Sequence, residues 1–211
     1  MYHNKIKYKT RIIFYIMLIV MYSGCVNIKS KYVSPNIYTF IDRPLNTSIT
    51  SKIDKGIFIK EFNINGELQT TKIAVYDNVN LQYYNYHQWA LPLDDLLTEY
   101  ATKRINNYNV FSKGLVSVFT TIPDYILECN VNTFRINKSD KENSVEISIF
   151  IHLNKYSSQT KDYKIFFSNT YTVNEMLDCF SLSLAVTNLE TIICKIIDNI
   201  LIDIINFDSN N

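Results

Sequence analysis

Between residues 145 and 152, apolar side chains stand at every second position. This alternation predicts a β-strand with one face buried and the other turned to solvent. The inward residues are Val145, Ile147, Ile149 and Ile151, and Glu146, Ser148, Phe150 and His152 are expected on the other face. Extended segments are predicted at Ile37–Asp42, Ile57–Ile64, Ile73–Asp77, Val79–Tyr84, Val116–Thr120, Tyr125–Ile136, Val145–Leu153 and Tyr163–Thr172.

A helix is predicted over Leu93–Asn106, where apolar residues recur at three- and four-residue spacing. Pro92 stands before it and suits the first helical turn. Acidic residues at its start and basic residues near its end would complement the helix dipole. These charged residues are Asp94, Asp95, Glu99, Lys103 and Arg104.

A long C-terminal amphipathic helix is predicted over Asn174–Asn206, which contains no Gly or Pro. Its apolar stripe is wider than the ~100° of an ordinary surface helix, so we expect cover on two sides, by the sheet and by a partner such as a second copy. Its charges argue against a membrane span. The polar face is expected to contain Thr187, Glu190, Thr191, Lys195, Asp198 and Asp203.

Together these elements predict an α/β fold over residues 37–206. It would be a single compact domain with a mixed β-sheet and packed helices, followed by a polar tail at residues 207–211.

The first 24 residues have the layout of a lipoprotein signal peptide. Basic residues precede the apolar run Ile12–Tyr22, and the small residues Ser23 and Gly24 stand before Cys25. This motif resembles the bacterial lipobox, with Tyr22 where an aliphatic residue is usual. Two alternatives remain: an uncleaved anchor, whose apolar run is short of the ~20 residues of a spanning helix, or cleavage elsewhere.

Lipidation of Cys25 with acyl chains such as palmitate would hold the mature protein on a membrane. Residues 25–36 would then form a short tether. Val26 stands where Asp would be the usual inner-membrane retention signal. We therefore expect the periplasmic face of the outer membrane.

The remaining cysteines, Cys129, Cys179 and Cys194, contain no C-x-x-C pair, so no metal site is expected. On one helix, Cys179 and Cys194 would be ~22 Å apart, too far to bridge. We expect at least two of the three to be buried free thiols, while a disulfide between another pair remains open.

Composition and motifs disfavour a nucleic-acid partner, an enzyme or a cofactor. The chain has 21 basic and 20 acidic residues, and the signal peptide contains several of the basic ones. Cys129 with His87 or His152 matches no catalytic signature, and the four glycines form no phosphate loop.

The segment before the first helix reads Tyr86-His87-Gln88-Trp89-Ala90-Leu91-Pro92. It resembles the ABC-type transport auxiliary lipoproteins, the outer-membrane accessory of MCE-type lipid transport systems. Leu91 stands where that family often has a charged residue. The resemblance covers nearly the whole mature chain and implies an α/β domain without catalysis. It also implies a periplasmic MCE-domain partner in a system driven by an inner-membrane ATPase.

The densest aromatic cluster of the chain contains Tyr83, Tyr84, Tyr86 and Trp89, and is the candidate docking surface. The competing interpretation of Trp89 is that it fills the core under the first helix. A second hypothesis is that the protein is an envelope assembly or scaffolding lipoprotein unrelated to MCE transport.

Overall fold

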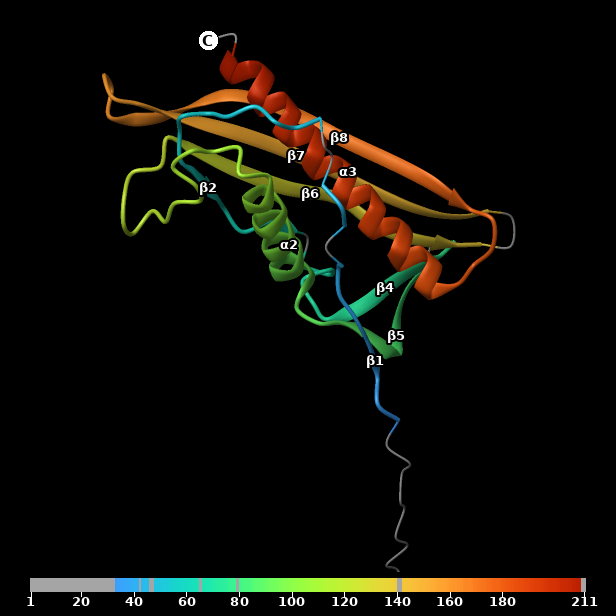
Figure 1. Ribbon diagram of the computed structural model, residues 1–211. Helices are drawn as coiled ribbons and strands as arrows, with labels where there is room; N and C mark the ends of the chain where they lie inside the picture. Colours follow the sequence, from blue (N-terminus) through green and yellow to red (C-terminus); the bar gives the residue numbers. More distant parts are fainter. Residues whose placement is uncertain are drawn as a thin grey trace, which may run out of the picture. The chain divides into compact units, whose positions relative to one another are not determined.

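The computed structural model describes residues 33–41, 43–45, 48–64, 66–78, 80–139 and 142–209. The signal peptide and Cys25 lie outside these residues. The unit Pro35–Asn211 contains an eight-stranded mixed sheet, with α2 (Leu93–Tyr108) and α3 (Leu182–Ser209) over one face (Figure 1). The predicted α/β domain with a long C-terminal helix is therefore confirmed.

The frame of the sheet is an antiparallel meander of three long strands, β6 (Tyr125–Lys138), β7 (Asn143–Ser157) and β8 (Asp162–Leu177). The predicted inward face of β7 is correct, because Ile147 and Ile149 are fully buried. On the other face His152 hydrogen-bonds Ser168, but Ser148, expected in solvent, is buried and hydrogen-bonds Thr172.

The other edge of β6 is lined end to end by three parallel segments: β2 (Ile57–Ile59), β3 (Asn63–Ile64) and the end of β4 (Lys72–Asp77). The single strand predicted over Ile57–Ile64 is thus divided in two. The break arises because the Phe62 N–H donates to the Thr98 hydroxyl of α2 at 2.9 Å.

The extended segments predicted at Ile73–Asp77 and Val79–Tyr84 form a hairpin, since β4 pairs antiparallel with β5 (Asn80–Trp89). Its second strand is longer than predicted and takes in most of the Tyr86–Pro92 segment. β1 (Asn36–Tyr38) pairs parallel with the end of β5 and closes that side of the sheet. It is shorter than predicted, and Asp42 lies outside the described residues.

The strand predicted at Val116–Thr120 is wrong. Val116 makes one ladder-like bond to Ile57, and the chain then turns. The Ser117 carbonyl accepts the N–H groups of Thr120 and Thr121 at 3.1 and 3.2 Å. These two backbone N–H groups are therefore not available to pair with a neighbouring strand.

The boundary predicted at Asn174 is also wrong, because β8 continues to Leu177 and α3 begins at Leu182. Ser181 caps the helix, with its hydroxyl accepting the Leu184 N–H at 3.1 Å. Cys179 precedes the helix, so the argument that helical spacing keeps it too far from Cys194 for a disulfide does not hold. The helix runs on to Ser209, into the predicted polar tail.

α3 is covered on two sides, by β7 and β8 of the sheet and by α2. Tyr171 and Tyr125 of the sheet donate hydrogen bonds to Asp203 and Asp208 of the helix. This chain itself supplies the second cover, so the wide apolar stripe no longer requires a second copy.

Two acidic residues assigned to the polar face of α3 are in fact buried. Asp198 pairs with Arg104 of α2, and Glu190 pairs with Arg43 at 3.0 Å. Arg104 therefore joins the two helices, instead of complementing the α2 dipole in solvent as predicted. A charge that neutralises an opposite charge can stand at an inward position that periodicity assigns to solvent.

Candidate docking surface

Trp89, the only tryptophan, is a core residue and not a docking residue. Its side chain is 2% exposed and packs against Phe40 and Phe134, with ring centroids 5.7 and 6.2 Å away. The backbone N–H of Trp89 donates to the Thr71 carbonyl at 2.7 Å. The competing interpretation of Trp89 is therefore correct.

Backbone bonds around Trp89 fix the strand edge beside it. The Ala90 N–H donates to the Tyr38 carbonyl at 2.8 Å, and Ile37 lies opposite Gln88 in the register of β1 and β5. Four exposed apolar side chains lie on β1, on β5 and directly after β5 at this end of the sheet. We call Ile37, Tyr83, Tyr86 and Leu91 the tyrosine patch; their exposed fractions are 64%, 38%, 55% and 36%.

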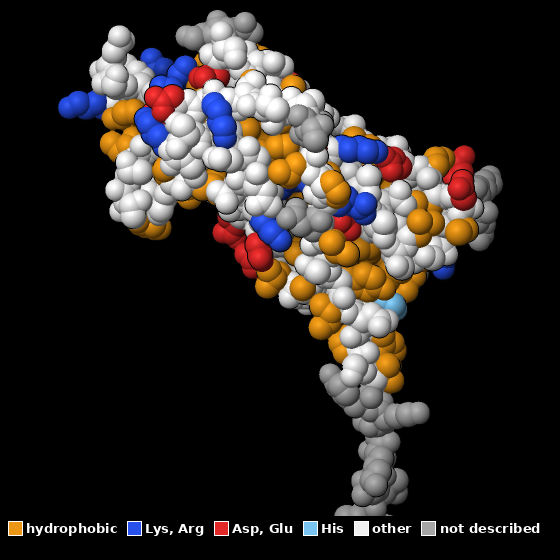
Figure 2. Space-filling view, viewed as in Figure 1, with side chains coloured by type: hydrophobic (Ala, Val, Ile, Leu, Met, Phe, Trp, Pro, Cys, Tyr) orange, Lys and Arg blue, Asp and Glu red, His pale blue; other side chains and the backbone are white. Residues whose placement is uncertain are grey.

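Tyr83 of the tyrosine patch is held in place by its neighbours. The Tyr83 hydroxyl donates to the Glu67 carbonyl at 2.8 Å, and the Lys72 ammonium lies 5.8 Å from the Tyr83 ring centroid. Figure 2 shows hydrophobic side chains gathered where β1, β4 and β5 lie. Exposed aromatic residues held in one conformation lose little entropy on binding, so this edge suits a protein partner.

Tyr84 is half-buried beneath the patch and packs partly against the core. Its ring meets the His87 ring edge to face, with centroids 5.6 Å apart. His87 in turn bonds the Tyr38 hydroxyl through Nδ1 at 3.1 Å. Tyr84 and His87 thus contact each other and Tyr38, and the more exposed Tyr83 and Tyr86 are the candidates for direct contact with a partner.

The structure separates the residues of the candidate catalytic pair. Cys129 is buried on the helix-covered face of β6, opposite Ile151. His152 is the next residue on β7, so its side chain points to the other face. Burial also raises the pKa of the Cys129 thiol, which keeps it protonated. His87 lies on β5, not beside Cys129 on β6. It hydrogen-bonds the Tyr38 hydroxyl and packs against the Tyr84 ring.

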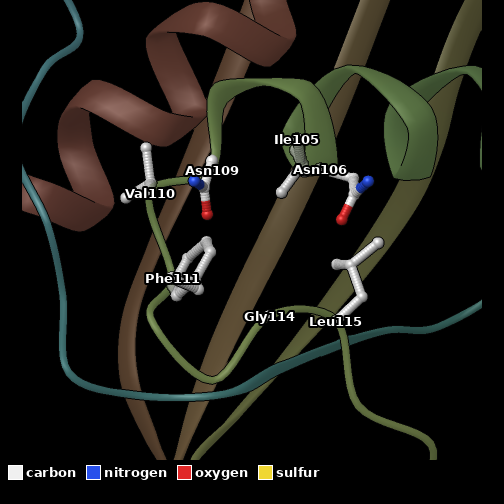
Figure 3. Close-up of a pocket in the computed structure, with 7 residues that line it drawn as sticks. All are labelled: Ile105, Asn106, Asn109, Val110, Phe111, Gly114 and Leu115. Carbon is white, nitrogen blue, oxygen red and sulfur yellow. The ribbon is translucent and has the colours of Figure 1, made fainter.

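Three hollows among the described residues are too small for an ordinary ligand. The one in Figure 3, behind the end of α2, has a volume of about 20 Å³, room for one water. It is lined by Ile105, Asn106, Asn109, Val110, Phe111, Gly114 and Leu115. Two surface hollows of about 200 and 270 Å³ are also below the ~300–1,000 Å³ of an ordinary ligand pocket.

The cysteines of the described part of the chain lie apart from the tyrosine patch in sequence. Cys129, Cys179 and Cys194 are all free thiols, but only Cys129 is buried, so the expectation of two buried thiols is wrong. No group of three His, Cys, Asp or Glu side chains there could hold a metal ion. No helix in that part meets the length and hydrophobicity that a bilayer span requires.

Comparison with known proteins identifies the fold. No family model matches the sequence, and no curated protein matches it. Protein XCC0632 from Xanthomonas campestris, of the DUF330 family, superimposes with a TM-score of 0.71 at 15% identity, over 83% of this chain and 97% of that chain. The chain has the fold of a DUF330 protein.

Two further crystal structures share this fold. One uncharacterised protein has a TM-score of 0.59 at 15% identity, over 81% of this chain and 99% of its own. The hypothetical protein CT253 from Chlamydia trachomatis has a TM-score of 0.52 at 7% identity, over 75% of this chain and 100% of its own. At these identities the likeness concerns the fold alone.

Proposed function

We propose that this chain is a lipoprotein, lipidated at Cys25, that acts as a non-catalytic accessory of an ABC/MCE-type envelope lipid transport system. It stands on the periplasmic face of the outer membrane and docks a periplasmic MCE-domain protein through the tyrosine patch. It needs no cofactor and has no nucleic-acid partner.

The observation that carries the proposal is that two aromatic residues of the Tyr86–Pro92 segment differ in burial. Trp89 is buried at the end of β5, whereas Tyr86 stands exposed on the same strand, two residues before Gln88, the register partner of Ile37. The segment that resembles the auxiliary lipoproteins therefore both builds the fold and presents an aromatic surface. The DUF330 fold agrees with the α/β domain that the resemblance implies.

Absence of catalysis is supported by the geometry. Cys129 and His152 point to opposite faces of the sheet, and Asp94, buried at the start of α2, accepts a hydrogen bond from Gln69 at 2.7 Å. Neither arrangement offers a nucleophile beside a base in an open pocket.

Affinity purification of the full chain from its own envelope, followed by mass spectrometry, tests this function. We expect an MCE-domain protein to co-purify, and a Tyr83→Ala/Tyr86→Ala variant to lose it. Met176→Ala, which removes an exposed apolar side chain from β8, serves as the matched control. Cys25→Ala tests the anchor and should release the protein from the outer membrane.

Different outcomes separate the alternatives. If the Tyr83→Ala/Tyr86→Ala variant still co-purifies the MCE-domain protein, the tyrosine patch is not part of the interface. Recovery of a β-barrel protein without an MCE protein would favour the scaffolding lipoprotein. Light scattering of the detergent-solubilised chain tests for a homo-oligomer, and monomer at high concentration would exclude one.

A further inference from the structure

A second exposed apolar feature lies far from the tyrosine patch along the chain, between α2 and β6. We call residues 117–122 the apolar turn. Phe119 is 96% exposed, Ile122 61% and Val118 44%. A fully exposed phenylalanine beside two exposed aliphatic residues is costly in water, so a surface of this kind marks an interaction site.

Local hydrogen bonds hold the apolar turn in one shape. Besides accepting the N–H groups of Thr120 and Thr121, Ser117 accepts the Phe119 N–H through its own hydroxyl at 3.3 Å. These bonds all converge on the base of the turn. Because the turn is closed at Ser117, the Phe119 side chain points into solvent.

The apolar turn is also tied to the body of the domain. Asp124 accepts the Gly56 N–H at 2.8 Å and the Lys113 ammonium at 3.1 Å. The Tyr163 hydroxyl of β8 donates to the Pro123 carbonyl at 2.8 Å. This bond joins the turn to the start of β8, where Ile165 is 60% exposed.

Basic side chains stand around this end of the domain. Lys113, Lys161 and Lys164 are exposed, Lys161 in the β7–β8 hairpin loop and Lys164 next to Tyr163. Of the nearby acids, Asp124 is paired with Lys113, and Asp162 accepts the Tyr163 N–H. Figure 2 shows Lys and Arg side chains, with some Asp and Glu between them, beside hydrophobic ones at the end that holds this hairpin.

We propose that the apolar turn dips into the interfacial region of an anionic bilayer and forms a membrane contact separate from the acyl chains. The projecting apolar tip would enter the boundary between headgroups and acyl chains, and the lysines would meet anionic headgroups. Lys113 is already paired with Asp124. Charge complementarity therefore favours an anionic bilayer over an apolar groove on a protein because of the exposed Lys161 and Lys164, which anionic headgroups would neutralise.

This contact goes beyond the proposed accessory role. An acyl anchor restrains one end of a protein but leaves the face presented to the bilayer undetermined. A second contact at residues 117–122 sets that face, and with it the direction in which the tyrosine patch points.

Fluorescence quenching in vesicles tests the contact. The full chain carrying Phe119→Trp is incorporated into phosphatidylglycerol vesicles with brominated acyl chains. Trp89 is buried in the core, so the wild-type chain gives the background. We expect the new indole to shift to the blue and to lose about half of its emission, as at a depth of ~5–10 Å.

Met176→Trp provides the matched control, because Met176 is 62% exposed at the other end of β8. Its indole should stay unquenched. Vesicles of neutral lipid should reduce quenching at position 119, as should Lys161→Gln/Lys164→Gln.

Two results would overturn the proposal. One is an indole at position 119 that keeps its water-like emission in anionic brominated vesicles. The other is a blue shift that rises with protein concentration in detergent without vesicles, which would assign the apolar turn to a contact between copies of the chain.

Discussion

Arg104 and Asp198 form a two-point ion pair inside the protein, although 94 residues separate them in the chain. Arg104 Nε lies 2.7 Å from Asp198 Oδ1, and Nη2 lies 2.9 Å from Oδ2. Nη1 donates to the Arg43 carbonyl at 3.1 Å. Burial by itself lowers the pKa of Arg104, but the bonds to Asp198 and its charge raise the pKa overall, so the guanidinium stays charged.

Loss of one partner of this pair should destabilise the fold. Asp198→Leu leaves the Arg104 guanidinium buried without its counter-charge, which we expect to cost about 3–5 kcal/mol of unfolding free energy. Urea unfolding of the full chain in detergent, followed by Trp89 fluorescence, measures this. The double variant Arg104→Met/Asp198→Leu should cost less than Asp198→Leu alone, and additive losses would contradict the coupling.

Trp89→Ala and Tyr86→Ala should differ sharply in stability although they lie three residues apart. Trp89 is 2% exposed, so its truncation opens a cavity and should cost about 3–5 kcal/mol. Tyr86 is 55% exposed, and its truncation should change stability by no more than about 0.5 kcal/mol. Thermal unfolding monitored by circular dichroism compares the two, and equal losses would contradict the assignment.

Acid should weaken the attachment of the apolar turn through Asp124. Burial works in the opposite direction, but the Gly56 N–H and the Lys113 ammonium hold the pKa of Asp124 below its ordinary value. Its contribution to stability is therefore present above the unfolded-state pKa of about 3.9 and is lost as pH falls through the lower folded-state pKa. Asp124→Asn should flatten the stability profile below about pH 4; a profile as steep as that of the wild type would argue against this role.

The three free cysteines should react with a thiol reagent in the order of their exposure. Cys179 is exposed, Cys194 is half-buried and Cys129 is buried. Burial raises the pKa of both Cys194 and Cys129, which lowers their thiolate fraction further. Mass spectrometry after timed alkylation should find Cys179 modified first and Cys129 only on unfolding. Early modification of Cys129 would contradict its placement in the core.

The central meander and the start of α2 could be predicted from the sequence because their signals are local. Alternation along Val145–Leu153 reflects one buried face, and Pro92 marks the start of a helix wherever it packs. The predicted ends of strands and helices were less accurate than their existence. Nothing in the pattern near Asn174 distinguishes the end of β8 from the start of a helix, and only the Ser181 cap marks the change.

The candidate site divides in the same way. The sequence by itself determined that Tyr83, Tyr84, Tyr86 and Trp89 form one aromatic segment before a helix, since this depends only on order along the chain. Only the tertiary structure decided that Trp89 is buried against Phe40, because exposure depends on contacts with distant segments.

The same reason explains the charged core and the apolar turn. The sequence predicts that Arg104 is a cation near a helix end, but in the fold α3 places Asp198 against it. The sequence likewise predicts that Phe119 belongs to a strand, but in the fold this residue lies in a turn. The sequence by itself determined which residues are apolar or charged and at what period they recur. The tertiary structure decided which of them meet, because pairing and burial are properties of segments distant in the chain.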